Sequence, residues 1–155
     1  MRRWLLYAGI FAGVLLLGIE PFHGTDVAKL SPVEVLYMDI QNGTICLKTD
    51  TGNVGLGENV TQALENMKKT TPGTVFLETA DYLLVTEKAA DLIGQLRQHL
   101  RPNCGVCIAE GEIQLEKIAE YLNAHEPEVS LQELRTGSKE LPVLTMEKGR
   151  AELVQ

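Results

Sequence analysis

The spacing of hydrophobic and polar residues along the chain predicts a succession of strands and helices. Residues 33–40 and 43–50 alternate or run apolar at strand length, and Asn42-Gly43 between them is a strong hairpin signal because both residues accept positive φ. Apolar residues at helical spacing predict helices at 59–69, 87–101 and 112–125. Short apolar runs predict buried strands at 74–78, 82–85 and 105–110.

The C-terminal part of the chain adds a short helix and a last strand. Ser130 and Glu133 form a capping pair that begins the helix, and Gly137 ends it. Residues 141–155 supply one strand, which can continue into a closing hairpin. The order of elements predicts an α/β fold at 33–155, one small domain with a mixed β-sheet and about three covering helices.

The pattern at the N-terminus is different, because residues 4–19 carry no charge and are apolar on every face. Arg2 and Arg3 precede this run, and its large side chains are suited to a membrane anchor: Trp4, Leu5, Leu6, Leu15, Leu16 and Leu17. A cleaved signal peptide has the same layout and stays open as an alternative, although no small-x-small cleavage pair follows the run. We therefore expect a transmembrane signal anchor at 1–22 and a stalk at 23–32.

Charge adds an orientation and excludes two classes of partner. Paired arginines ahead of the apolar run stay in the cytoplasm, so the sequence predicts a single-pass membrane protein whose C-terminal domain lies outside. Residues 23–155 hold 12 Lys and Arg against 20 Asp and Glu, a net charge of −8, and the charges form no basic patch. Such a domain repels nucleic acid and anionic lipid headgroups, and neither is expected as a partner.

Cys104 and Cys107 form a Cys-x-x-Cys, the pattern in the chain that most resembles a reactive site. Thioredoxin-like motifs lie where a strand gives way to a helix, whereas here a helix ends at Pro102 and Cys107 falls inside a strand. Alternation along the strand predicts side chains on opposite faces, which opposes a disulfide. Structural cysteines are the favoured interpretation. A zinc site lacks its remaining ligands.

Gly52, Gly55 and Gly57 precede the helix at 59–69, an arrangement that can cradle a phosphate. Their spacing matches neither a Walker loop nor a dinucleotide fingerprint, and no Lys or Arg lies nearby to balance an anion. A structural turn is the favoured interpretation. The sequence contains no recognisable nucleophile with a paired base, so no catalytic residue, cofactor or metal is predicted.

One region resembles a known family. The shared features are a Gly-x-Gly turn, a helix with a central Ala-Leu, a strand, and an apolar strand leading into Glu-x-x-Ala-x-x-Ile. They lie here at Gly55 to Gly57, Ala63-Leu64, Val75-Phe76-Leu77, Leu83-Leu84-Val85, Glu87, Ala90 and Ile93. This stretch is similar to the N-terminal domain of the spore-germination receptor C subunits of endospore-forming bacteria. The resemblance implies a non-catalytic, membrane-tethered α/β module on the outer face of the membrane. Family members are longer and are anchored through a lipidated cysteine, which this chain lacks after its apolar run.

These observations lead to three hypotheses of decreasing weight. The first is a membrane-anchored, extracytoplasmic, non-catalytic binding or assembly module whose partner is an envelope or membrane protein, linked to the envelope or to sporulation and germination. The alternative is an envelope thiol-disulfide protein that uses Cys104 and Cys107. The third is a phosphate or nucleotide sensor that uses the loop at 52–57.

Overall fold

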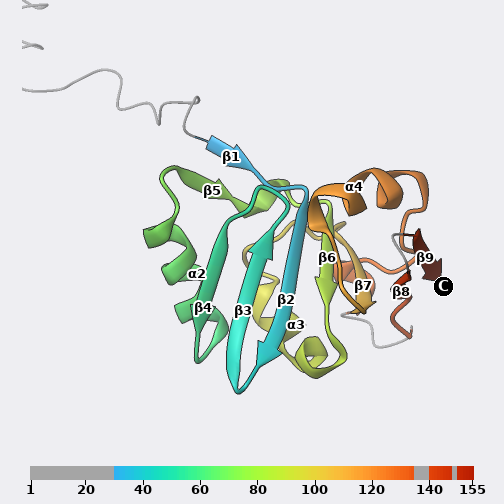
Figure 1. The fold of residues 1–155 in the computed structure, drawn as a ribbon, viewed down its shortest axis with the longest axis horizontal. Coiled ribbons are helices and arrows are strands. Elements are labelled where there is room, and N and C mark those ends of the chain that lie inside the picture. Colours follow the sequence, from blue (N-terminus) through green and yellow to red (C-terminus); the bar gives the residue numbers. More distant parts are fainter. Residues whose placement is uncertain (1–29, 135–139, 148–149) are drawn as a thin grey trace, which may run out of the picture.

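The computed structural model describes residues 30–134, 140–147 and 150–155, which form an α/β domain around a mixed sheet (Figure 1). In spatial order its strands are β4 (Val54–Gly57), β3 (Thr44–Thr49), β2 (Val35–Gln41), β6 (Tyr82–Val85), β7 (Gly105–Glu110), β8 (Val143–Glu147) and β9 (Arg150–Val154). Strands β2, β6, β7 and β8 run parallel to one another. On one side β3 pairs antiparallel with β2 and β4 pairs antiparallel with β3, and on the other side β9 pairs antiparallel with β8. The predicted α/β class and mixed sheet are therefore confirmed.

Local turn chemistry accounts for the β2–β3 hairpin. Asn42 and Gly43 have φ values of 52° and 80°, the left-handed pair that a two-residue hairpin turn requires. Gln41 and Thr44 are directly opposite each other across this turn. The hairpin expected from Asn-Gly is present, and the C-terminal hairpin of β8 and β9 is present as well.

The centre of the sheet is apolar because it is covered on both faces. Every residue of β6 is buried, and Leu83 and Leu84 are completely inaccessible. Strands in this position bury both faces and therefore appear as continuous apolar runs without alternation. The run at 82–85, read from the sequence as a buried strand, is this central strand.

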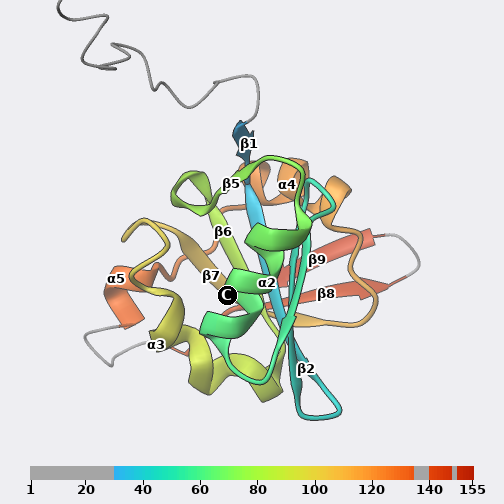
Figure 2. The same ribbon diagram turned by 90° about the vertical axis from the view of Figure 1, so that its left-hand side faces the viewer.

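Helices lie on both faces of the sheet. One face packs against α2 (Val60–Thr70), the 3-10 helix η3 (Glu87–Leu92), α3 (Ile93–Leu96) and α5 (Leu131–Leu134). The other packs against α4 (Leu115–Ala124). Figure 2 looks at the β4 edge, with α2 nearest the viewer and α3 and α5 to one side. The described part of the structure thus has four α-helices, which correspond to the three longer helices and the short one predicted from the sequence.

Two of the expected helices need correction. The helix expected at 87–101 begins as η3, continues as the single turn α3, and ends in turns before Pro102. Its first residues are not capped, because the Thr86 hydroxyl donates to Asp39 Oδ1 at 2.9 Å instead of bonding the helix amides. The helix expected at 112–125 begins only at Leu115. By contrast, α2 agrees closely with 59–69, and the Asn59 side chain accepts from the Gln62 amide at 2.9 Å.

The segment at 74–78 also differs from expectation. Only Thr74–Phe76 form a strand, β5, and it pairs in parallel with β1 (Leu30–Pro32) in a separate two-stranded sheet. Val75 alone of β5 faces the core, so the strand is half exposed. The Thr79 hydroxyl, in the 3-10 helix η2 (Leu77–Thr79), accepts from the Val33 amide at 3.0 Å and fixes this small sheet against the domain. Leu30–Pro32, which the sequence assigned to the stalk, therefore belong to a strand.

The strand β4 was not anticipated, and side chains of α2 close its outer edge. The Leu56 amide donates to Asn66 Oδ1 at 3.1 Å, and the Thr70 hydroxyl donates to the Val54 carbonyl at 3.3 Å. Both backbone groups point away from β3 and would otherwise be available to another strand. Asn66 and Thr70 thus protect this edge against strand pairing.

The predicted membrane anchor lies outside the described residues, with Trp4, Leu5, Leu6, Leu15, Leu16 and Leu17. Within the described ranges, none of the helices combines the length and the apolar character that a membrane span requires.

Candidate functional site

The two thiols of the Cys-x-x-Cys lie on opposite faces of the main sheet. Cys104 packs in the cluster beneath α2 and α3, and Cys107 packs in the cluster beneath α4. Both are completely buried, and both are free. The backbone of β7 therefore separates the two sulfurs, and this arrangement lends no support to a redox pair.

Burial also makes these thiols poor nucleophiles. It raises the pKa of Cys104 to about 12 and the pKa of Cys107 to about 12, although Arg101 opposes the shift at Cys104. Reactive cysteines have lowered pKa values, because the thiolate is the reacting species. The third cysteine, Cys46 on β3, is buried as well, and burial raises its pKa.

The glycine motif has a packing role that the sequence did not indicate. Gly52 has a φ of 82° and forms the turn between β3 and β4, as a structural turn requires. Gly55 and Gly57, however, belong to β4 and face α2. A Cβ atom on Gly55 would lie 2.2 Å from the Ala63 carbonyl oxygen, and one on Gly57 would lie 2.4 Å from the Ala63 amide nitrogen. Absence of side chains lets the helix pack directly on the strand.

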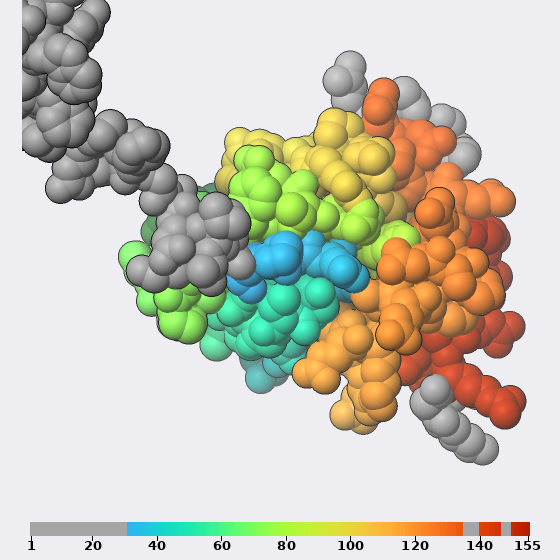
Figure 3. Space-filling model, turned by 90° about the horizontal axis from the view of Figure 1, so that it is seen from above, coloured from blue at the N-terminus to red at the C-terminus, as the bar shows by residue number. Residues whose placement is uncertain are grey.

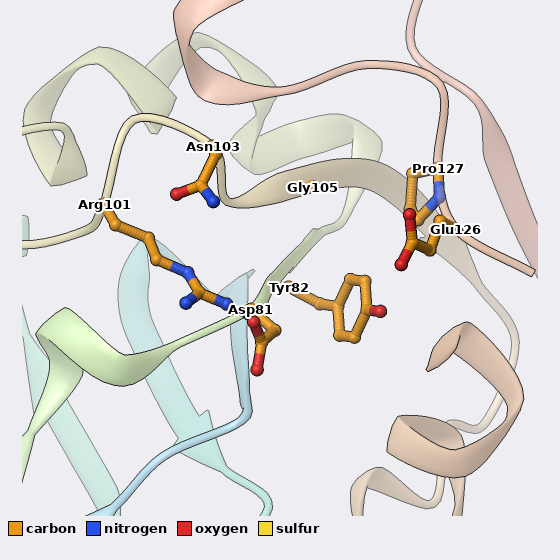
Figure 4. Close-up of a pocket in the computed structure, with 7 residues that line it drawn as sticks. All are labelled: Asp81, Tyr82, Arg101, Asn103, Gly105, Glu126 and Pro127. Carbon is orange, nitrogen blue, oxygen red and sulfur yellow. Dashed lines mark ion pairs between the residues drawn. The ribbon is translucent and has the colours of Figure 1, made fainter. Parts of the chain in front are cut away.

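A polar hollow lies at the amino ends of β6 and β7. It has a volume of about 160 Å³, and Figure 4 shows Arg101 reaching toward Asp81 on one side, with Tyr82 and Glu126 on the other. Three of its polar side chains have partners, because Asp81 and Arg101 form an ion pair and the Tyr82 hydroxyl donates to Asn123. Burial raises the pKa of Tyr82, and the charge of Glu126 adds to this effect.

The position and size of this hollow do not favour a ligand site. Pockets for drug-sized ligands measure about 300–1,000 Å³ and are mostly apolar. In open α/β sheets, moreover, ligands bind beyond the carboxyl ends of the parallel strands, whereas this hollow lies at the amino ends. We interpret the Asp81–Arg101 pair as a structural link between two loops.

The carboxylate of Asp39, near the carboxyl end of β2, accepts three hydrogen bonds. Oδ1 accepts from the Thr86 hydroxyl at 2.9 Å and from the Ile40 amide at 2.7 Å, and Oδ2 accepts from Gln41 at 3.0 Å. Burial raises its pKa, but the hydrogen bonds and the charge of Lys88 outweigh burial and hold the pKa below its usual value. Asp39 therefore fastens β2 to the end of β6 as a carboxylate.

A second hollow is larger and lies on the α4 side of the sheet. It has a volume of about 360 Å³ and runs between the β3–β4 turn and the segment that leads into α4. Val54 and Leu56, on β4, are 43% and 51% exposed on this side. Sequence reasoning missed this surface because it took the glycines for a loop. The signal was the alternation Val54-Gly55-Leu56-Gly57, with bulky residues on one face and glycine on the other.

Metal and family assignments add nothing to this picture. No group of three or more metal-ligating side chains occurs within the ranges that the structure describes. No family model, curated protein or solved structure matches the chain.

Proposed function

We propose that the protein is a membrane-anchored, extracytoplasmic module that binds another envelope or membrane protein and has no catalytic activity. The arrangement along the chain carries this proposal: two arginines and an apolar run at 2–19 precede a folded domain that begins at Leu30. The acidic charge of residues 23–155 is consistent with a protein partner and opposes nucleic acid.

A short connection would keep the domain close to the bilayer. Residues 23–29 separate the proposed anchor from β1, and even fully extended they span only about 25 Å. Figure 3 looks onto the end of the domain where β1 and the beginning of β2 (blue) lie at the surface. This end would face the membrane, and the carboxyl ends of the parallel strands would point away from it.

The chemistry of the described ionisable groups favours binding over catalysis. Cys104 and Cys107 have raised pKa values and separate locations. Asp39 and Asp81 are held in structural interactions. The similarity of residues 55–93 to germination receptor C subunits is the basis for proposing the envelope of a spore-forming bacterium as the setting.

Topology reporters test the anchor. Alkaline phosphatase, which is active only outside the cytoplasm, and green fluorescent protein are fused in turn to Gln155 of the full chain. We expect an active phosphatase fusion that stays in the membrane fraction after carbonate washing. Leu16→Arg, in the apolar run, should release it, because a charge at the centre of a span costs about 2.5–3.5 kcal/mol. Leu56→Arg, at a position outside the run whose side chain is 51% exposed, serves as the control. A fluorescent fusion in the supernatant would refute the proposal.

A further inference from the structure

The α4 side of the sheet is only partly covered. The apolar residues beneath α4 come from β2, β6, β7, β8 and β9, whereas the exposed Val54 and Leu56 lie on β4 at the other end of the same face. Cys46, opposite Leu56, and Asp39, opposite Cys46, lie on this face too, but Cys46 is buried and Asp39 is already hydrogen-bonded to Thr86. We refer to the side chains that remain at least partly exposed, those of Tyr37, Lys48, Val54 and Leu56, as the open face. In the described part of the chain, the open face is bordered by α4 and by the segment that leads into α4.

The groove of about 360 Å³ lies where the open face meets the segment before α4. Val54, Ile113 and Leu115 contribute apolar side chains to it, and Lys48 and Lys117 contribute positive charge. Neither lysine forms an ion pair with a carboxylate of the described residues. The lining has two lysines and one glutamate, Glu116, so it is net positive within a domain of net charge −8.

A partner strand is a poor fit here because the edges of the sheet are protected. Asn66 and Thr70 bond the outward groups of β4, and the Tyr121 hydroxyl accepts from the Leu153 amide of β9 at 3.0 Å. Strand addition needs free backbone groups at an edge. Recognition on this side must therefore use side chains of the open face.

We propose that the open face and its groove bind an amphipathic helix of a partner protein, with acidic residues beside the apolar stripe. Sheets of this class are covered by helices on both faces, and the partner helix would complete the layer next to α4. Lys48 and Lys117 select the acidic flanks, because the rest of the domain repels them. This inference rests on the proposed binding function and specifies the class of partner.

Model peptides provide the test. The full chain, in nanodiscs of neutral lipid, is titrated against a fluorescent amphipathic peptide of about 14 residues, roughly four turns, with leucine on one face and glutamate beside it. A second peptide carries lysine in place of glutamate. We expect saturable binding of the glutamate peptide by anisotropy, and binding at least about tenfold weaker for the lysine peptide.

Charge reversal distinguishes specific docking from adhesion. Lys48→Glu with Lys117→Glu should weaken binding of the glutamate peptide about tenfold, so that the double variant binds the lysine peptide more tightly than the glutamate peptide. Lys68→Glu with Arg97→Glu makes the same charge change at two exposed positions on the opposite face, one in α2 and one directly after α3, and should have no effect. Leu56→Asp should abolish binding while thermal melting shows a folded domain. Equal binding of both peptides, equal effects of the two charge reversals, or no saturation below about 1 mM would overturn the proposal.

Two further outcomes separate this inference from others. If the full chain self-associates and Leu56→Asp abolishes this association, a second copy of the chain occupies the open face, and the proposal of a partner helix is refuted. Peptide binding does not depend on membrane orientation. A failed topology assay together with charge-dependent peptide binding would therefore refute the membrane anchor and support the docking surface. A successful topology assay without charge-dependent binding would refute the docking surface alone.

Discussion

Replacing Gly55 by alanine tests whether the glycine motif packs a helix or forms a ligand loop. The new Cβ would lie 2.2 Å from the Ala63 carbonyl oxygen and 2.8 Å from Met67 Cβ. Ordinary non-bonded contacts to carbon lie at about 3.5 Å or more, so α2 and β4 would have to separate by roughly 1 Å. The carbonyl belongs to a helical backbone and cannot rotate away as a flexible side chain could.

The expected cost of Gly55→Ala is near the upper end for overpacking. Inserted methyl groups in a tight core typically cost about 1–3 kcal/mol, and a clash with backbone leaves little room for relief. A loss of about 3 kcal/mol is a large part of the roughly 5–15 kcal/mol that stabilises a domain. For a domain of this size it corresponds to a decrease in Tm of about 10 °C.

Gly94→Ala is the matched control because it makes the same chemical change in α3. Nothing lies within 4 Å of a Cβ at Gly94, and alanine is the better helix former, so we expect a gain of about 0.5–1 kcal/mol. Thermal melting of the full chain by circular dichroism compares the two variants with the parent. If the Tm of Gly55→Ala equals that of the parent, or follows that of Gly94→Ala, the packing explanation is wrong.

Two more predictions concern the thiols and pH. Iodoacetamide at pH 8 should modify Cys104 and Cys107 slowly in the native protein and rapidly in urea, since burial raises the pKa of each to about 12; fast native labelling, or a reducible link between them, would contradict the fold. For Asp39, a pKa lowered by its hydrogen bonds contributes stability above the unfolded pKa, and this stability disappears as pH falls through the folded pKa. Urea titrations should thus show Asp39→Asn less stable than the parent at pH 7, with the difference shrinking below about pH 4. A difference that does not change with pH would show that Asp39 acts through something other than its charge.

Signals that depend on neighbouring residues predicted the fold well. Asn42-Gly43 specifies its turn through backbone preference, and the apolar spacing at 59–69 predicts α2, which side-chain bonds of Asn59 and Gln62 to the backbone begin in the structure. The alternation along the strand that begins near Cys104 predicted that Cys104 and Cys107 lie on opposite faces, as found. In each case the determining contacts lie within a few residues of one another.

Errors arose where distant contacts determine the structure. The glycines at 55 and 57 resemble a loop until α2 is placed against them, and only then does the strand become the better explanation. The sequence predicts a helix that begins at residue 87, but the hydroxyl of Thr86, which could cap it, donates to Asp39, far away in sequence. The polar hollow likewise joins residues 81 and 101, whose proximity depends on the pairing of β6 with β7.

Closing the edges and leaving a face open has one consequence for how this domain can associate. At the far edge, the Tyr121 hydroxyl accepts from the Leu153 amide of β9 at 3.0 Å and occupies a backbone donor that another strand would use. Together with the bonds of Asn66 and Thr70 at β4, this bond opposes uncontrolled growth of the sheet. What the domain leaves accessible is the open face, the surface that we propose selects a partner by shape and charge.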